Sequence, residues 1–308
     1  MRLSIRTARW RAHVAQVAAS TPGLVPVVKG NGYGFGREWL AEVAAEFADT
    51  IAVGTIHELE GLPASVTPVV LTPTLVPPTP ARQKGSEPVL TIGNESHLAA
   101  LAGWNGRVVV KLASRMQRFG GTPALVDAAR TAGLDVVGVS IHPPLAGTGA
   151  DHAAEITRWL PSVDPSLPVW VSHLDGPAYA SLPQTHTYRN RLGTWLWHGD
   201  KSALHLSAEV LERRAVQPGD RAGYHLGEVP GEGHLVMIGA GSAHGVAPLP
   251  DGRSPFHFAR ARLTLLEAPH MHVSMCFVPA GQTGPAIGDR VDVQRPLTMT
   301  LIDEFEWL

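Results

Sequence analysis

The sequence predicts an α/β protein, with an N-terminal (β/α)8 barrel over residues 1–200 and an antiparallel β domain over residues 201–308. In the first two hundred residues, eight short apolar segments alternate with helical patterns, which is typical of a barrel. After about residue 198, strand-like runs follow one another without an ordinary helix between them. A chain of 308 residues is long enough for two such domains.

The apolar segments predict the barrel strands. In order, they begin at residues 24, 50, 68, 89, 107, 136, 168 and 193 and read LVPVV, TIAVG, PVVLTP, VLTIG, RVVVKL, VVGVSI, PVWVSH and GTWLW. Helical patterns such as REWLAEVAAEFA separate several of them. Near the N-terminus, Trp10, Val14 and Val17 recur at helical spacing and predict an amphipathic helix. The proline-rich segment 72–88 predicts a surface connection.

Glycine, proline and aspartate divide the last hundred residues into short strands. The strand-like runs are HLSAEVLERRAV, RAGYHL, GHLVMIG, ARLTLLEA, HVSMCFV and DRVDVQ. Because strands in this pattern are joined by short turns, we expect them to pair antiparallel.

Composition argues against several classes of protein. A net charge of −2 and a pI of about 6.7 give no basic field for nucleic acid. No apolar run approaches the roughly 20 residues of a membrane helix, and the basic N-terminus lacks the apolar core of a signal peptide. The single cysteine, Cys276, fits a reducing compartment and reads as a core residue. We therefore expect a cytoplasmic protein without nucleic-acid or membrane partners.

Polar residues follow several predicted strands. Lys29 ends the first strand, Lys111 and Arg118 flank the end of the fifth, and His142 ends the sixth. The carboxyl ends of barrel strands meet at one mouth, where active sites of this fold lie. An ammonium group at the end of a buried strand is costly unless it is paired, neutral or covalently used.

A lysine at such a position can form an imine with a carbonyl, and the usual carbonyl is pyridoxal phosphate. The loop GNGYGFG after Lys29 would let the backbone approach a phosphate, and the Tyr33 hydroxyl could donate to it. Spacing alone leaves open a structural lysine followed by an ordinary turn.

Several segments resemble motifs of the alanine racemase family. VVKGNGYGFG resembles the cofactor-lysine signature V-V-K-A-N-A-Y-G-H-G. Five further segments, VVVKLASRMQRFG, VVGVSIHPPLAG, RLGTWLWHG, GDRAGYHL and MHVSMCFVP, resemble family motifs in the family's order. Because the matches span nearly the whole chain, it is identified as a divergent member of this family.

The resemblance implies a pyridoxal 5'-phosphate-dependent racemase that works as a head-to-tail homodimer. Proton exchange at Cα needs one base on each face of the substrate. The resemblance assigns these roles to Lys29 and to Tyr224 from the partner's β domain. A tyrosine with its ordinary pKa of about 10 is a weak base and needs cationic neighbours, which His142 and Arg191 are expected to supply.

The resemblance also assigns binding roles. The residues implied to bind the cofactor are Lys29, Tyr33, His142, Arg191, Gly193 and Thr194. Those implied to contact the amino-acid substrate are Arg118, Met271 and His272, and Lys111, often carbamylated in the family, is implied to support Arg118. Arg191 is expected to face the pyridine nitrogen and to keep it unprotonated.

The chain departs from the family pattern at the implied substrate entrance. Ala240 stands where the family has a tyrosine, and His272 stands where it has an aspartate. These changes favour a substrate bulkier than alanine and not basic. The C-terminal tyrosine that grips the phosphate in the family has no counterpart in RPLTMTLIDEFEWL.

Two alternative functions remain open from the sequence. One is a non-catalytic or degenerate pyridoxal-phosphate-binding paralogue, and the other is a lyase or decarboxylase on the same barrel. His270 and His272, two apart on one strand, hint at a metal, but no cysteine or carboxylate partner is evident and we expect none.

Overall fold

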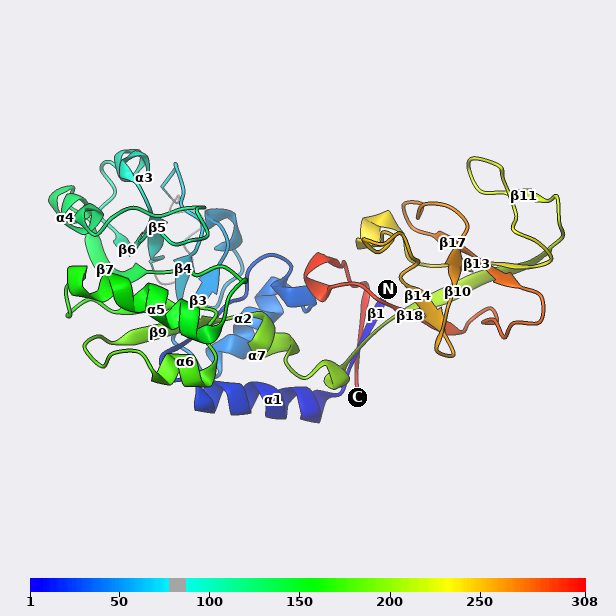
Figure 1. Ribbon diagram of the computed structural model, residues 1–308, viewed down its shortest axis with the longest axis horizontal. Helices are drawn as coiled ribbons and strands as arrows, with labels where there is room; N and C mark the ends of the chain where they lie inside the picture. The colour runs from blue at the N-terminus through cyan, green and yellow to red at the C-terminus, as the bar shows by residue number, and fades with distance from the viewer. Residues whose placement is uncertain (78–86) are drawn as a thin grey trace. The chain divides into compact units, whose positions relative to one another are not determined.

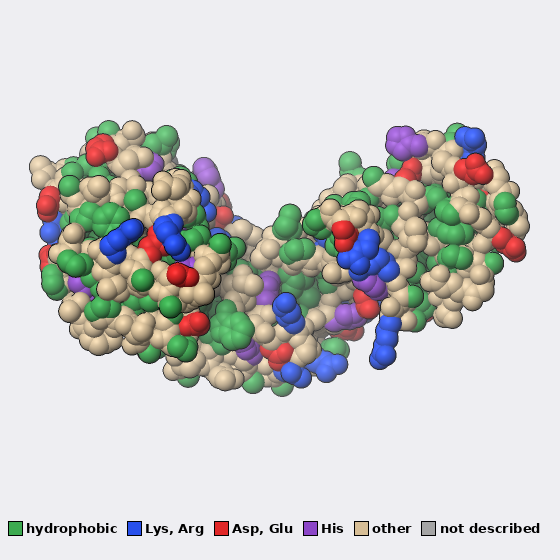
Figure 2. Space-filling view, viewed as in Figure 1, with side chains coloured by type: hydrophobic (Ala, Val, Ile, Leu, Met, Phe, Trp, Pro, Cys, Tyr) green, Lys and Arg blue, Asp and Glu red, His purple; other side chains and the backbone are tan. Residues whose placement is uncertain are grey.

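The computed structural model describes residues 1–77 and 87–308, in two compact units (Figure 1). One unit comprises His13–Gly199, and the other joins Met1–Ala12 to Asp200–Leu308. Part of the surface connection expected at 72–88 lies outside the described residues. No helix of the described chain is long and apolar enough to cross a membrane. On the face shown in Figure 2, acidic and basic side chains are interspersed in both units.

Eight parallel strands close into a barrel in the first unit. They are β2 (Leu24–Pro26), β3 (Thr50–Val53), β4 (Thr67–Val70), β5 (Leu90–Ile92), β6 (Arg107–Lys111), β7 (Asp135–Ser140), β8 (Val169–Val171) and β9 (Tyr188–Leu192). Six pair in the order β2-β9-β8-β7-β6-β5, and β3 pairs with β4. Parallel bridges Val27–Ala52 and Val69–Val89 join the two groups and complete the circle. The predicted (β/α)8 barrel is thus confirmed.

Helices surround the strands (Figure 1). They are α1 (Thr7–Ser20), η1 (Gly32–Gly34), α2 (Arg37–Ala45), η2 (Ile56–Glu58), α3 (Glu95–Ala100), α4 (Ala124–Thr131), α5 (Gly149–Trp159), η4 (Leu160–Ser162), α6 (Gly176–Ala180) and α7 (Thr194–His198). The amphipathic pattern of α1 is confirmed, because Trp10, Val14 and Val17 are all buried. A capping box between Thr148 and Asp151 begins α5.

The eighth barrel strand is not the one predicted. The segment GTWLW, expected as a strand from residue 193, instead forms the start of α7, and the strand is Tyr188–Leu192. Its sequence, YRNRL, is too polar to stand out as a buried strand, yet Asn190 and Arg191 are 4% and 7% exposed. The closed barrel buries these polar groups, so an apolarity pattern could not find the strand.

The second unit is built of short strands. They are β1 (Arg2–Ile5), β10 (Leu204–Val216), β11 (Arg221–Ala222), β12 (Gly227–Glu228), β13 (Gly233–Ile238), β14 (Phe256–Phe258), β15 (Ala261–Arg262), β16 (Thr264–Leu265), β17 (Ser274–Pro279), β18 (Arg290–Val293) and β19 (Glu304–Trp307), with 3-10 turns η5 (Lys201–Ala203), η6 (Ser242–His244) and η7 (Leu297–Met299). All ladders are antiparallel except β1–β19, and the predicted β domain is confirmed. Cys276 is fully buried in its core, and burial raises the pKa of its thiol to about 12, which makes it unreactive.

The N-terminal residues belong to this second unit. Expected within a barrel of residues 1–200, β1 instead pairs with β10 and β19. Leu3 and Ile5 are fully buried there. Four residues with two apolar side chains carry too little pattern to reveal such distant partners, which are separated from β1 by some two hundred residues or more.

Candidate functional site

The carboxyl ends of the barrel strands bring together the predicted polar residues of this unit. Lys29 follows β2, Lys111 is the last residue of β6, and His142 follows β7. Arg191 lies on β9 and Arg118 in the loop after β6. These groups interact electrostatically, since both guanidinium groups lower the pKa values of Lys111 and His142. The sequence-predicted cluster is therefore one site and not five separate residues.

Arg191 is a buried cation held by oxygen atoms of neighbouring strands. Its Nη1 donates to Ser140 Oγ at 2.9 Å, its Nη2 to Ile141 O at 3.0 Å, and its Nε to Val171 O at 3.3 Å. Burial lowers the pKa of the guanidinium to about 10, and Arg118 contributes to the shift. At neutral pH Arg191 still carries its charge, so it is a fixed positive group in the barrel.

His142 is held as a neutral imidazole. Its Nδ1 lies 2.5 Å from Ser172 Oγ, and the same hydroxyl accepts from Arg191 Nη2 at 3.4 Å. Burial and the Arg191 charge lower the pKa of His142 to about 2. We assign the hydroxyl as donor to Nδ1, which leaves the ring proton on Nε2. The expectation that His142 adds positive charge is therefore wrong, because its surroundings keep it uncharged.

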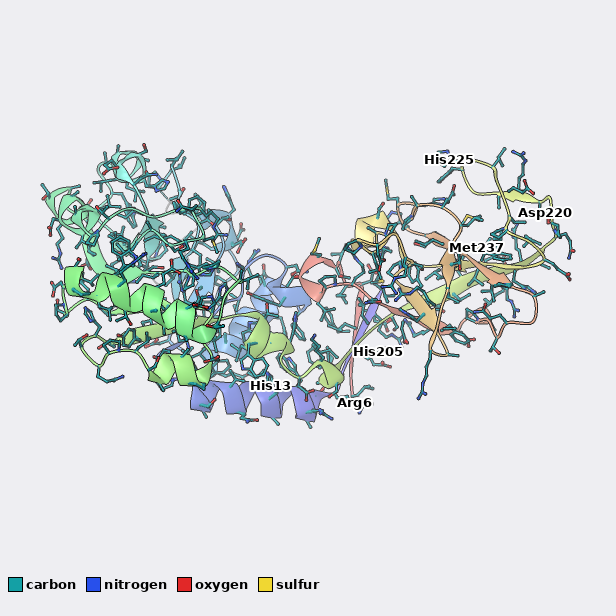
Figure 3. All side chains as sticks on the ribbon, viewed as in Figure 1. Arg6, His13, His205, Asp220, His225 and Met237 are labelled. Atoms are coloured by element: carbon teal, nitrogen blue, oxygen red, sulfur yellow. The ribbon has the colours of Figure 1, made fainter. Side chains whose placement is uncertain are left out.

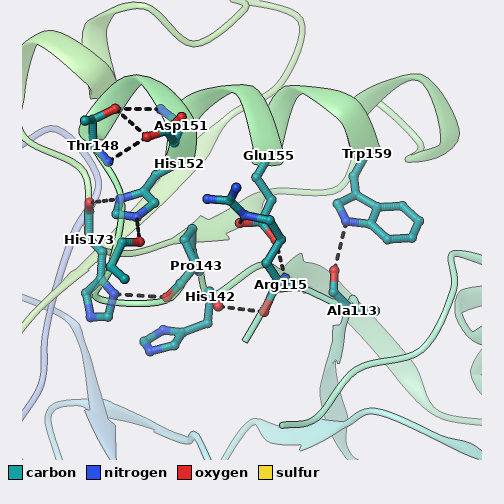
Figure 4. Close-up of polar contacts among 12 residues, drawn as sticks. Ala113, Arg115, His142, Pro143, Thr148, Asp151, His152, Glu155, Trp159 and His173 are labelled. Carbon is teal, nitrogen blue, oxygen red and sulfur yellow. Dashed lines mark hydrogen bonds and ion pairs between the residues drawn. The ribbon is translucent and has the colours of Figure 1, made fainter. Parts of the chain in front are cut away.

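The loop carrying His142 is tied down by two further histidines (Figure 4). The Nδ1 of His173 lies 3.0 Å from Pro143 O, and its ring lies 4.6 Å from the His142 ring. From α5, His152 reaches His173 O at 2.9 Å and Ala146 O at 3.1 Å. The sequence analysis did not identify these residues. His173 was within reach, because it closely follows the apolar strand β8 just as Lys29 follows β2.

Lys111 is buried near the aromatic ring of Phe119, which the Arg118 guanidinium also approaches. Its side chain is 4% exposed, and its Nζ lies 5.9 Å from the centre of the Phe119 ring, which Arg118 approaches to 5.4 Å. Burial, together with Arg191, Arg118 and Lys29, lowers the pKa of Lys111 to about 7. The lowered pKa favours the neutral amine, which is the reactive form.

Lys29 lies at the mouth of the barrel, where the residue as a whole is exposed but its amine is partly desolvated. Burial of the amine and the Arg118 charge lower its pKa, while Glu58 opposes the shift. The Glu58 carboxylate also accepts from Gly30 N at 3.2 Å and from Gly54 N at 2.7 Å, which ties the lysine loop to the end of β3. The sequence analysis did not identify Glu58, although this residue lies soon after the predicted strand TIAVG. A lowered pKa favours the neutral amine that covalent chemistry needs.

Tyr33 packs against the start of α7. Its φ of 56° is left-handed, its side chain is buried, and burial raises its pKa to about 12, so its hydroxyl keeps its proton. A Cβ built on Gly193 would lie 2.6 Å from Tyr33 Cζ and even nearer its hydroxyl oxygen. Only glycine admits the phenol here, and the hydroxyl therefore lies beside Gly193 and the first residue of α7, Thr194.

The other predicted residues gather in the second unit. Tyr224, 81% exposed, lies in the loop between β11 and β12, where Figure 3 shows His225 at the tip. Met271 and His272 are exposed in the loop before β17. The ring of His270 lies 4.2 Å from that of Tyr224, so the two loops are adjacent.

Ala240 was expected at an entrance, but its side chain is fully buried in the core of the unit and lines no opening there. His270 and His272 contact different groups, Glu267 and His244 respectively. Among residues 1–77 and 87–308, no three histidine, cysteine or acidic side chains are placed to hold a metal.

The barrel site suits an anionic aldehyde cofactor. It combines the Lys29 amine, whose pKa is lowered, the cations Arg118 and Arg191, and a protonated phenol packed against Gly193. Positive charge and hydroxyl donors favour a phosphate or carboxylate. The donor set thus fits pyridoxal phosphate, a phosphorylated aldehyde.

Comparisons with known proteins identify the family and the fold. The family model described as "Alanine racemase, N-terminal domain" matches residues 5–195. A search of the curated proteins found no match. Solved structures of similar fold include the alanine racemase from Bartonella henselae, with covalently bound pyridoxal phosphate, which is 16% identical over 99% of this chain and 99% of that one, with a TM-score of 0.74.

Two further structures are similar over the same length. The alanine racemase from E. faecalis is 18% identical, with 100% of this chain and 98% of that one covered and a TM-score of 0.71. The biosynthetic alanine racemase from Pseudomonas aeruginosa is 17% identical over 100% of both chains, with a TM-score of 0.67. At such identities the likeness establishes the fold across both units.

Proposed function

Since this chain belongs to the alanine racemase family, we propose that it is an amino-acid racemase that uses pyridoxal 5'-phosphate and interconverts L- and D-amino acids. The observation that carries the proposal is the cluster of Lys29, Lys111, Arg118 and Arg191 at one end of the barrel. When bound, the cofactor withdraws electrons from the substrate and so acidifies its Cα–H bond.

The chain's own residues supply binding and proton transfer. Arg118 binds the substrate carboxylate, and Tyr33, Gly193 and Thr194 hold the phosphate. Lys29 exchanges the proton on one face of Cα and Tyr224 exchanges it on the other, as two-sided exchange requires.

The remaining barrel residues set the charge of the site. Arg191 keeps a positive charge near the cofactor ring, which disfavours the protonated ring nitrogen of lyase and decarboxylase chemistry. His142 contributes a neutral imidazole to the cofactor site. The Ser172 hydroxyl holds this ring and in turn accepts a hydrogen bond from Arg191. The lowered pKa of the Lys111 amine suits carbamylation, and a carbamate would hold Arg118 in place.

The proposal includes a cytoplasmic homodimer. Tyr224 and Lys29 belong to different units of the chain. The resemblance to the family implies that the partner's β domain completes the site. A free, buried Cys276 is in keeping with a reducing compartment.

We further propose a substrate bulkier than alanine and not basic. In support, His272 is exposed where the family carries an aspartate. An imidazole tolerates polar or acidic side chains better than a carboxylate does.

The test is α-hydrogen exchange in deuterated water with the cofactor-loaded protein and a panel of amino acids. We expect exchange and racemisation of at least one amino acid, and loss of both in Lys29→Ala. A cofactor-bound protein that exchanges nothing would indicate the non-catalytic paralogue, and release of carbon dioxide or ammonia would indicate a decarboxylase or lyase. An alanine preference of tenfold or more, about 1.4 kcal/mol, would overturn the substrate assignment.

A further inference from the structure

We propose that Glu267 and His270 are positioning residues that hold Tyr224 in place for proton transfer, an inference that rests on the proposed function of Tyr224. Tyr224 lies in a loop whose flanking strands, β11 and β12, are two residues each. A ladder this short is too weak to order a loop by itself. Because Tyr224 is also 81% exposed, contacts outside the hairpin are needed to fix its position.

The carboxylate of Glu267 supplies the first of these contacts. It accepts from the backbone N–H of Tyr224 at 2.9 Å and of His225 at 3.5 Å. Gly223 has a φ of +80°, and a Cβ there would lie 2.6 Å from Glu267 Oε2. The missing side chain lets the loop wrap onto the carboxylate, and charge-assisted hydrogen bonds of this kind are stronger than neutral ones.

The imidazole of His270 supplies the second contact. Its Nε2 forms a short hydrogen bond with Glu267 Oε1, and its ring lies 4.2 Å from the Tyr224 ring at 44°. One imidazole therefore fixes the carboxylate that holds the tyrosine backbone and at the same time packs against the tyrosine side chain. Hydrogen bonds from His270 and from the two backbone N–H groups hold the pKa of Glu267 below its usual value, although burial opposes this.

His270 is itself anchored to the β unit. Its N–H donates to Val273 O at 2.9 Å, and its carbonyl accepts from Ser242 N at 2.8 Å. The next carbonyl, that of Met271, accepts from Ala243 N at 2.9 Å. The chain of contacts thus runs from the body of the unit through His270 and Glu267 to Tyr224. A displacement of about 1 Å at a reacting group can cost roughly 100-fold in rate, which gives such an anchor a role in catalysis.

The test compares His270→Gln and Glu267→Gln with a matched control, His205→Gln. His205 forms a similar pair with Asp292, 2.7 Å apart, and lies well away from His225 in Figure 3. The first readout is α-hydrogen exchange of each substrate enantiomer separately. We expect exchange of the enantiomer that presents its proton to Tyr224 to fall about 10- to 100-fold, while exchange of the one facing Lys29 stays within twofold of wild type.

The second readout is amide hydrogen exchange of residues 222–228, which needs neither cofactor nor substrate. Both test variants should exchange about tenfold faster there, and the control should not. An equal fall for both enantiomers, no fall for either, or unchanged loop protection would each overturn the positioning role. If the wild-type protein activates no amino acid, the proposed function fails, and the loop measurement still decides whether these two residues order Tyr224.

Discussion

Replacing Gly193 by alanine should weaken cofactor binding through a defined collision. The added Cβ would lie 2.6 Å from Tyr33 Cζ and 3.1 Å from its Cε1, whereas carbon atoms in contact prefer about 3.5–4.0 Å. The φ of Gly193 is −124°, so the collision, and not left-handed backbone, is the obstacle. The buried phenol must therefore move by about 1 Å, and overpacking of this kind costs roughly 1–3 kcal/mol.

The expected result is a loss of affinity with the fold retained. If the displaced hydroxyl no longer meets the phosphate, the dissociation constant for pyridoxal phosphate should rise about 5- to 150-fold, which corresponds to 1–3 kcal/mol. Titration of the cofactor-free protein, followed by absorbance, measures this constant, and thermal unfolding reports stability. Gly176→Ala is the matched control, because its Cβ meets nothing within 4 Å. Wild-type affinity in Gly193→Ala would refute the close packing of Tyr33 against Gly193.

Three further outcomes follow from the site. Lys111 has a pKa of about 7 in the folded protein and an ordinary value of 10.5, so the unfolded chain binds more protons between these pH values. The unfolding free energy of the cofactor-free protein should therefore rise with pH across that window. Lys111→Met should flatten the rise, and an unchanged slope would count against the buried amine. Nitrogen NMR should find His142 neutral from pH 5 to 9 with its proton on Nε2, and Ser172→Ala should change that tautomer ratio; a wild-type ring that titrates near 6.5 would contradict the assignment. Mixing Lys29→Ala and Tyr224→Phe subunits should restore one intact site per mixed dimer, and failure after verified subunit exchange would argue against a shared site.

The positions of the barrel residues were predictable because one rule covers them. Polar residues directly after apolar strands identified Lys29, Lys111 and His142, and a buried strand end has few structural uses for an ammonium group. The same rule extends to His173 and Glu58, which follow β8 and β3. Their partners, a backbone carbonyl for one and two N–H groups for the other, have no sequence signal.

Other features depended on long-range contacts that local pattern does not carry. The strand Tyr188–Leu192 looks polar because Arg191 is satisfied by oxygens from β7 and β8, and only the closed barrel provides them. The neutrality of His142 likewise follows from burial beside that guanidinium. Ala240 resembled an entrance residue by alignment of motifs, whereas packing places it in a core.

Borohydride reduction of the cofactor-loaded protein tests the central claim most directly. Reduction fixes the cofactor to the amine that holds it, and mass mapping of peptides then identifies that amine. We expect a yellow protein whose reduced label lies on the peptide containing Lys29, with no label in Lys29→Ala. Label on Lys111 or Lys201 instead, or no cofactor bound at all, would contradict it.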